Sequence, residues 1–598
     1  MSRIIMYLIL ALALFSLSYA IFLRYNRGLA RNSRGQQFRR YLVASLLASL
    51  PSTISLESSW AMAVIAVTAV LWMVTYNILY DKTHRKSSPD YDNHMDIAFG
   101  IYLFGWLSCL GAIMAGCGVA GTVVMIIVEV LLLVLPLFQI MYYLIYKVCV
   151  DANGMQVVQE TNYNEVIEYI KSFKSYKVVM ITMATLLAVA MMTIANIQIS
   201  GNNLLTPHST HEWAALAVVV ALLIFFSIYI WKISHGLFVR TGIVILYNDI
   251  LEYRKSNKAY KEGRAQRLKS LAVSQPEAPV PHPHTIVMVI GESACRDYMD
   301  LYRKQDFPTT PWQSDMNAGD DRFILFSQAY SCAMQTVPSL ERALTECNQY
   351  NDKDFVTACS IVDIAHKAGY RVHWYSNQGH LGCADTPVTL VAETSDVAKW
   401  TKQELNKVQY DQSLLEFMDE LNPEVNNLLV LHLKGNHFNY SNRYPEYYAQ
   451  ANGLASGDDV VTYKNSIHYN DHILKSIYDY ARQKLNMAAM VYFSDHGAIP
   501  YMRRSPRFLG FGMVRIPLWV WLSEEYATIH SDVFQALKDN KDKSFTNDLI
   551  YELMCGLMCI QSEHYDTTAS IASNQYRYTK EMMTTYDGRI KLTDDKEG

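Results

Sequence analysis

MAAMVYFSDHG, residues 487–497, is the stretch that decides how the second half of this chain folds. Its seven apolar residues, 487–493, predict a buried strand that ends at the polar residues after it. Asp495 and His496 lie side by side at that end, and a carboxylate beside an imidazole can bind a divalent metal ion. Residues 286–293, IVMVIGES, repeat the design, with Glu292 after the strand. Two strands that end in carboxylates predict metal-assisted transfer chemistry at the carboxyl edge of an α/β sheet.

The rest of the second half predicts the sheet that these two strands join. Its apolar runs are short, rich in Val, Leu and Ile, and separated by helix-like segments. This alternation predicts a mostly parallel sheet sandwiched by helices, in an α/β soluble domain over residues 284–598. The runs are Thr285–Ile290, Tyr370–Tyr375, Asn427–Leu433, Met487–Phe493 and Val514–Leu522.

The first 235 residues have a different composition, with most of the long apolar runs of the chain. Runs of about 20 apolar residues match the thickness of a bilayer, whereas the core helix of a soluble protein is shorter and carries a polar stripe. We therefore expect a multi-span α-helical membrane domain over residues 1–235. The candidate spans are Ile4–Leu23, Trp60–Tyr80, Ile97–Ala115, Val119–Ile145, Val178–Ile199 and Trp213–Ile233.

Charge indicates which side of the membrane the soluble domain occupies. The loop after the first span carries six arginines, from Arg24 to Arg40, and no acidic residue, which places it in the cytoplasm. Five further spans then put residues 284–598 outside, although a crossing at Tyr41–Leu50 would reverse this result. The net charge of −4 gives no indication of a nucleic-acid partner, and none is expected.

Residues 236–283 form a connector between the two domains. Leu246–Lys269 is amphipathic and basic, which predicts a helix on an anionic headgroup surface; a solvated linker helix is the alternative. Four prolines between Pro276 and Pro283 then predict a stiff, extended spacer.

Thr336 is the candidate nucleophile. Pro338 suits the first turn of a helix, so Thr336 is expected at or beside the helix N-terminus, where free N–H groups favour negative charge on its oxygen. A nearby metal ion would lower the pKa of the hydroxyl further. The alternative is that Thr336 only caps the helix.

The ten cysteines are compatible with disulfides in an oxidising compartment, and the lack of a CxxC pair argues against a zinc–thiolate site.

The order of these motifs resembles one family. Behind a multi-span anchor come Gly291-Glu292-Ser293, Ser331-Cys332 with a threonine four residues after the cysteine, Gly435-Asn436-His437 after a strand, and Ser494-Asp495-His496-Gly497. This series is similar to the bacterial phosphoethanolamine transferases, which modify lipid A and the lipopolysaccharide core and include enzymes of polymyxin resistance. They belong to the alkaline phosphatase/sulfatase superfamily.

The resemblance implies roles for individual residues. Glu292, Asp495 and His496 match the Zn²⁺ ligands, and Thr336 matches the nucleophile that contacts the metal and carries the phosphoethanolamine. Residues implied in substrate binding are His437 near the second metal or the phosphate, Thr161 and Glu165 at the ethanolamine head group, and Asn377 and His380 after the 370–375 strand.

The chain departs from the family pattern after the Asp-His pair. Lipid A members carry a further histidine there, whereas Ala498–Val514 contains none and offers Arg503, Arg504 and Arg507. An arginine fork binds phosphate, so we expect at least one of the three to contact a substrate phosphate and only one zinc ion to bind tightly.

The resemblance implies transfer of phosphoethanolamine from phosphatidylethanolamine to a lipopolysaccharide-type acceptor through a phospho-threonine. The protein would lie in a bacterial inner membrane with its catalytic domain in the periplasm. One alternative is a glycerophosphate polymerase or a sulfatase; sulfatases need Pro two residues and Arg four residues after their Cys or Ser, and Cys332 is followed there by Met334 and Thr336. The other is a non-catalytic relative that only binds lipopolysaccharide, but such relatives tend to lose the nucleophile or the ligands.

Overall fold

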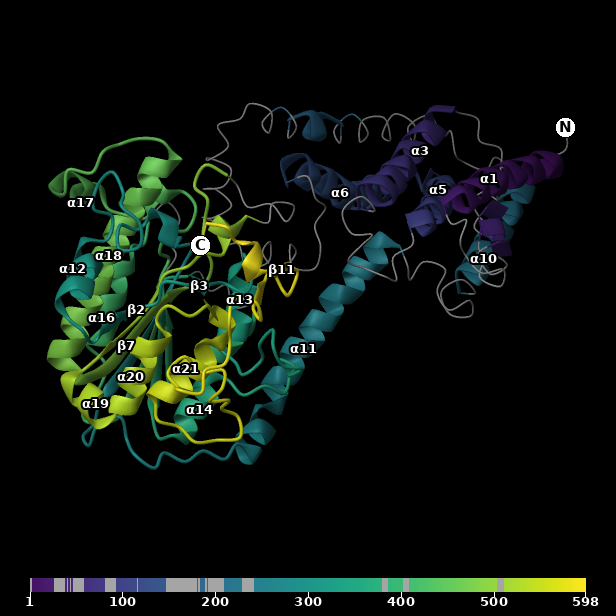
Figure 1. The fold of residues 1–598 in the computed structure, drawn as a ribbon. Helices are drawn as coiled ribbons and strands as arrows, with labels where there is room; N and C mark the ends of the chain where they lie inside the picture. The colour runs from purple at the N-terminus through teal and green to yellow at the C-terminus, as the bar shows by residue number, and fades with distance from the viewer. Residues whose placement is uncertain are drawn as a thin grey trace. The chain divides into compact units, whose positions relative to one another are not determined.

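The computed structural model divides the chain into two compact units (Figure 1). Residues 1–155, 173–252 and 505–507 contribute to the first unit, and residues 156–172, 253–504 and 508–598 to the second. The structure describes residues 3–25, 38–39, 41–43, 45–46, 59–80, 93–115, 117–146, 180, 183–188, 191, 209–228, 241–378, 386–401, 408–502 and 510–597.

The first unit is helical where it is described. Trp72, Tyr76, Leu103 and Leu107 form a small buried cluster, and the indole N–H of Trp72 donates to the Leu132 carbonyl at 2.9 Å. The elements are α1 (Arg3–Tyr25), α3 (Ser59–Met73), the π-helical turn η2 (Val74–Tyr80), α5 (Asn93–Ala115), α6 (Gly118–Tyr146) and α10 (Thr210–Ile228).

Apolar side chains cover much of the outer surface of these helices. Leu12 of α1, Leu131 of α6 and Phe225 of α10 are more than 60% exposed, as lipid-facing residues would be. Among the described residues, the stretch Gly118–Tyr143 is long and apolar enough to cross a bilayer, and Ala66–Tyr76 and Trp213–Leu222 are shorter apolar stretches. The multi-span architecture stays a prediction, since much of the Val178–Ile199 span lies outside the described residues.

The second unit is built on a seven-stranded sheet in the order β2-β8-β7-β1-β6-β4-β5. Five of its strands coincide with the predicted apolar runs. The sheet is mixed, because β8 runs antiparallel to both β7 and β2, whereas the other four pairings are parallel. The strands are β1 (Thr285–Gly291), β2 (Phe323–Leu325), β4 (Arg371–Ser376), β5 (Val397–Trp400), β6 (Asn427–His432), β7 (Met487–Ser494) and β8 (Leu518–Leu522).

Helices cover both faces of this sheet (Figure 1). Alternate residues of β1 point to opposite faces: Ile286 and Met288 join the core against α13, α14 and α21, whereas Val287 and Val289 join the core against α16 and α18. The helices are α12 (Pro311–Gly319), α13 (Thr336–Ala343), α14 (Ile361–Lys367), α15 (Pro387–Ala392), α16 (Leu414–Met418), α17 (Glu446–Ala451), α18 (Asp459–Lys484), α19 (Glu524–Ile529), α20 (Ser531–Asn540) and α21 (Ile550–Leu557).

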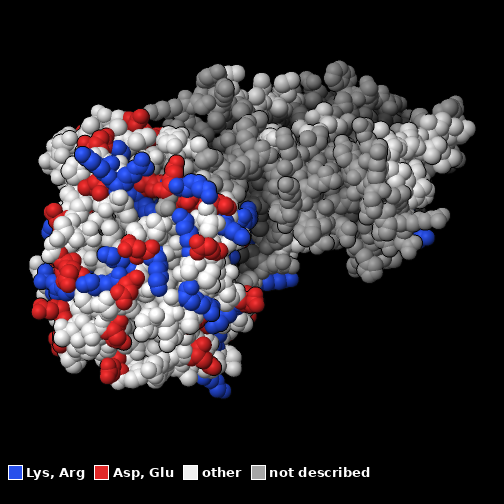
Figure 2. Space-filling model, viewed as in Figure 1, with Lys and Arg blue, Asp and Glu red and all other residues white. Residues whose placement is uncertain are grey.

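Two small two-stranded sheets complete the second unit. The first pairs β3 with β9 in parallel and the second pairs β10 with β11 antiparallel. Their bounds are β3 (Ala329–Tyr330), β9 (Phe545–Thr546), β10 (Thr584–Thr585) and β11 (Ile590–Lys591). On the face that Figure 2 shows, basic and acidic side chains intermix over the second unit.

The basic connector segment forms helix α11 (Gly242–Ser270). In its last turns, Tyr260 stacks on Phe355 with ring centroids 4.3 Å apart. The buried Arg267 donates to the Val356 carbonyl at 3.0 Å, and Arg264 pairs with Asp363 at 3.2 Å. The prediction of a headgroup-facing basic surface is therefore wrong for these two arginines, which the soluble domain binds instead.

Candidate active site

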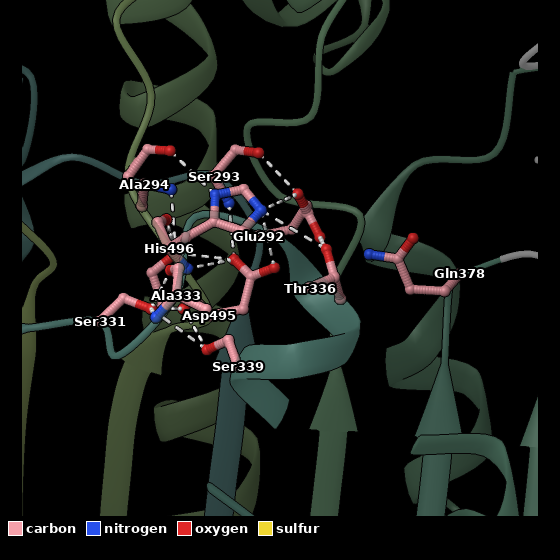
Figure 3. Close-up of polar contacts among 12 residues, drawn as sticks. Glu292, Ser293, Ala294, Ser331, Ala333, Thr336, Ser339, Gln378, Asp495 and His496 are labelled. Atoms are coloured by element: carbon pink, nitrogen blue, oxygen red, sulfur yellow. Dashed lines mark hydrogen bonds and ion pairs between the residues drawn. The ribbon is translucent and has the colours of Figure 1, made fainter. Parts of the chain in front are cut away.

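The three predicted metal ligands meet at the carboxyl ends of two adjacent strands. Because Gly291 of β1 pairs in register with Ser494 of β7, the residues that follow each strand are neighbours. Glu292, Asp495 and His496 are buried, and one ligand atom from each lies within 4.8 Å of the others. Figure 3 shows them converging, with Thr336 beside them.

The hydrogen bonds of His496 leave one ring nitrogen ready to bind a metal ion. Its Nδ1–H donates to the Gly497 carbonyl at 2.8 Å, so the lone pair of Nε2 faces the carboxylates. Nε2 lies 3.1 Å from Asp495 Oδ2 and 3.4 Å from Glu292 Oε1. At zinc sites the ring nitrogen of a ligand histidine that does not bind the metal usually donates a hydrogen bond to a carboxylate or a backbone carbonyl. Two carboxylates and one imidazole therefore fit Zn²⁺ with a position left for substrate.

Ser293 holds the two carboxylates in place. Its backbone N–H donates to Asp495 Oδ1 at 2.9 Å, and its hydroxyl donates to Glu292 Oε1 at 2.6 Å. The residue adopts φ 59°, a left-handed conformation that is uncommon outside glycine, and its carbonyl accepts a hydrogen bond from Tyr463 at 2.7 Å. Strained residues of this kind cluster at functional sites.

Thr336 is the first residue of α13, as predicted from Pro338. Gln335, not Thr336, occupies the N-cap position, so the alternative of a plain capping role is wrong. The Thr336 hydroxyl donates to Glu292 Oε2 at 3.0 Å and lies 3.4 Å from His496 Nε2. The residue is half-buried, in contrast to the fully buried ligands, so part of it is open to solvent.

A backbone oxygen joins the nucleophile helix to the ligand strand. The Asp495 carbonyl accepts hydrogen bonds from Ser331 and Ser339 at 2.6 Å each and from the Asn547 amide at 2.7 Å. Ser339 belongs to α13, so this contact fixes Thr336 relative to Asp495. Asn547 also accepts from the Cys332 N–H at 2.9 Å. Ser331 belongs to a motif quoted from the sequence, but Ser339 and Asn547 were not predicted, because the contacts join segments far apart in the sequence.

The loop after β6 packs on the backbone of Glu292. Asn436 N–H donates to the Glu292 carbonyl at 2.8 Å, and Gly435 has φ +49°. His437 follows in this loop and is half-buried.

His432, at the end of β6, was not singled out from the sequence. Burial lowers its pKa to about 4, although the nearby Glu292 carboxylate acts in the opposite direction, and its buried Nε2 has no hydrogen-bond partner among the described residues.

Asn377, predicted to bind substrate, makes hydrogen bonds to two other side chains of the second unit. Its amide donates to Asp411 Oδ1 at 2.8 Å and accepts from the Thr401 hydroxyl at 2.7 Å. Asp411 in turn accepts from the N–H groups of Lys434 and Gly435, and burial raises the pKa of this carboxyl. The predicted residues Thr161, Glu165, His380, Arg503, Arg504 and Arg507 lie outside the described residues.

A family model matches the part of the chain that carries the site. Residues 284–555 match the sulfatase family. The chain is also similar to the phosphoethanolamine transferases, as its motifs predicted. Phosphoethanolamine transferase EptC of Escherichia coli (strain K12) is 26% identical over 498 residues, which cover 76% of this chain and 83% of EptC.

Solved structures extend the similarity to both parts of the chain. The integral membrane protein lipooligosaccharide phosphoethanolamine transferase A (EptA) of Neisseria meningitidis has a TM-score of 0.54 at 18% identity, covering 85% of this chain and 98% of EptA. The periplasmic domain of Escherichia coli EptC in complex with Zn has a TM-score of 0.48 at 25% identity, covering 55% of this chain and 97% of that domain. The similarity to the Neisseria meningitidis protein shows that this chain shares the fold of EptA.

Proposed function

We propose that this protein transfers phosphoethanolamine from phosphatidylethanolamine to a lipopolysaccharide-type acceptor, with a zinc ion at Glu292, Asp495 and His496. The position of Thr336 carries the proposal. A half-buried hydroxyl at the start of a helix, 3.0 Å from one ligand and 3.4 Å from another, has the placement that a metal-activated nucleophile requires.

The reaction would proceed in two displacements at Thr336. In the first, Thr336 Oγ1 forms a bond to phosphorus and the bond from phosphorus to the glycerol oxygen breaks, so diacylglycerol leaves with the proton. In the second, an acceptor oxygen forms a bond to phosphorus, the bond from phosphorus to Thr336 Oγ1 breaks, and the proton from the acceptor restores the Thr336 hydroxyl. Bound zinc would lower the pKa of the hydroxyl and offset charge on the phosphoryl oxygens.

The residues of the chain supply orientation for both steps. Ser293 holds Glu292 and Asp495 through its hydroxyl and its N–H, and Ser339 with Asn547 holds α13 against the Asp495 carbonyl. Thr336 is the first residue of α13, and the N–H groups at a helix start would favour negative charge on the phosphoryl group.

The names of the relatives support the transferred group and the acceptor class. EptC is named a phosphoethanolamine transferase, and the Neisseria protein is named a lipooligosaccharide phosphoethanolamine transferase. We further propose that the first unit anchors the protein in the inner membrane by several spans and that residues 284–598 work in the periplasm, where the acceptor is displayed. The intact set of Glu292, Thr336, Asp495 and His496 argues against a non-catalytic relative.

Mass spectrometry tests the proposal directly. The full chain is expressed in a host that lacks its own transferases, and lipid A and core oligosaccharide are separated before measurement. We expect a mass increase of one phosphoethanolamine in one of the two fractions. Glycerophosphate chains would instead identify a polymerase, and an unchanged envelope would refute the proposal.

Thr336→Ala is the matched variant for the mechanism. It removes the nucleophilic oxygen and leaves the three ligands, so we expect transfer to be lost while zinc stays bound. Thr336→Ser keeps an oxygen at the same position and is expected to retain part of the activity. Transfer by Thr336→Ala at the wild-type rate would exclude the phospho-threonine route.

A further inference from the structure

A second group of potential metal ligands lies outside the active site. Glu346 and Cys359 are buried and His564 is half-buried, and one ligand atom from each lies within 4.8 Å of the others. None of the three belongs to the set around Thr336. Glu346 follows the end of α13, Cys359 precedes the start of α14, and His564 follows α21.

Hydrogen bonds fix the Glu346 carboxylate between the other two residues. The Cys359 N–H donates to Glu346 Oε1 at 2.9 Å, and the Glu346 N–H donates to the Cys359 carbonyl at 3.1 Å. His564 Nδ1 lies 3.1 Å from Oε1 and 3.0 Å from Oε2 of the same carboxylate. An imidazole nitrogen and a carboxylate oxygen that share a zinc ion lie about this far apart, given metal bonds of about 2.0–2.2 Å.

The charge at this position favours a cation. A buried carboxylate needs a positive partner, and the Lys353 ammonium contacts Glu346 Oε2. The Lys353 side chain is 43% exposed, so it can turn into solvent when another cation replaces it. Glu346 is 3% exposed and stays in place. The ammonium therefore occupies a position that a divalent ion can take.

The third side chain sets the kind of metal. Cys359 is a free thiol, 1% exposed, and a thiolate sulfur is a ligand that zinc binds in proteins. A sulfur, a nitrogen and an oxygen ligand together suit zinc and exclude the oxygen-preferring Mg²⁺ and Ca²⁺.

We propose that Glu346, Cys359 and His564 bind a divalent transition-metal ion of the zinc type, separate from the active-site metal. This proposal departs from the expectations of a single tightly bound zinc ion and of no zinc–thiolate site, because one thiolate from Cys359 needs no CxxC pair. The ion would join the C-terminal end of the nucleophile helix α13 to α14 and to the segment after α21. Its role would be structural, because no substrate-reactive side chain described above belongs to the group.

Cobalt spectroscopy on the full chain in detergent tests this site separately from the active site. Co²⁺ bound to a thiolate gives a charge-transfer absorption in the near ultraviolet, and the active-site ligands include no thiol. We expect this absorption in the wild type and in Glu292→Ala, where the active site is impaired. Cys359→Ser should abolish it, whereas Cys347→Ser should keep it, because the Cys347 thiol donates to the Lys353 carbonyl and lies outside the ligand group.

Two further variants keep the test decisive if Cys359→Ser fails to fold. His564→Gln is expected to weaken Co²⁺ binding at this site at least tenfold, measured by titration of the same absorption in the Glu292→Ala background. Lys353→Gln removes the competing ammonium and should strengthen binding severalfold. The proposal is overturned if Glu292→Ala shows no thiolate absorption at saturating Co²⁺, if the absorption persists in Cys359→Ser, or if both titrations match the parent.

Discussion

Gly435→Ala tests how tightly the loop after β6 supports the metal ligand Glu292. A Cβ atom at position 435 would lie 2.9 Å from both the N and the O atoms of Glu292 and 3.3 Å from its Cβ. Backbone atoms cannot swing away as a side chain does, so either the loop or Glu292 must move. The φ of +49° adds the strain of a left-handed conformation for alanine.

The expected magnitude follows from these distances. Ordinary contact begins at 3.4 Å, so the backbone must separate by about 0.5 Å from the 2.9 Å contact. Since a misplacement of about 1 Å can cost a factor of about 100 in rate, a shift of this size at Glu292 should lower kcat about tenfold. The left-handed alanine costs a further ~1–2 kcal/mol of stability.

Gly453→Ala is the matched control, because Gly453 has φ +63° and nothing within 4 Å of its Cβ position. Both variants should lose stability in thermal unfolding, and Gly435→Ala should lose more because of its contact with Glu292. Only Gly435→Ala should lose transfer activity, measured with a fluorescent phosphatidylethanolamine donor. Equal activity in the two variants would refute the reasoning that the loop positions Glu292.

Three further predictions concern the nucleophile helix, the core and the metal. Asn547→Ala removes hydrogen bonds to the Asp495 carbonyl and to Cys332 N–H, so it should destabilise the protein by about 2–3 kcal/mol; an unchanged melting temperature would contradict this. Burial raises the pKa of Glu552 from 4.5 to about 8, so the folded state holds a proton that the unfolded state releases, and stability should fall as pH rises from 4.5 to about 8. Glu552→Gln should flatten that pH dependence in thermal unfolding, and an equally steep profile would exclude Glu552 as its source. Chelation should abolish transfer and added Zn²⁺ should restore it, whereas activity that survives full metal removal would exclude the metal mechanism.

The site at the strand ends could be predicted because its ligands follow uninterrupted apolar runs. Asp495 and Glu292 each come directly after a strand, and the parallel pairing of two buried strands brings such residues to one edge. Thr336 could be placed from Pro338 alone, since proline is tolerated in the first helical turn. The antiparallel direction of β8 could not be predicted, because an apolar run carries no information about its direction.

The residues that hold the ligands and the second metal group in place could not be predicted from the sequence. Asn547 lies 52 positions from Asp495, and His564 lies 218 positions from Glu346, so no local spacing marks either pair. The headgroup-binding role of α11 was predicted from its basic composition. Composition shows that arginines are present, but it does not show whether an arginine binds a lipid headgroup or, as here, the Asp363 carboxylate or the Val356 carbonyl. Only tertiary packing decides between such partners.

The convergence of three donors on the Asp495 carbonyl has a practical consequence for trapping substrates. Every amino acid brings the same main-chain oxygen, so replacing the Asp495 side chain leaves the acceptor for Ser331, Ser339 and Asn547 in place. Asp495→Asn would thus impair the metal site while the nucleophile helix keeps its anchorage. Such a variant offers an inactive yet correctly assembled enzyme in which a lipid donor could be captured intact for crystallography or cryo-electron microscopy.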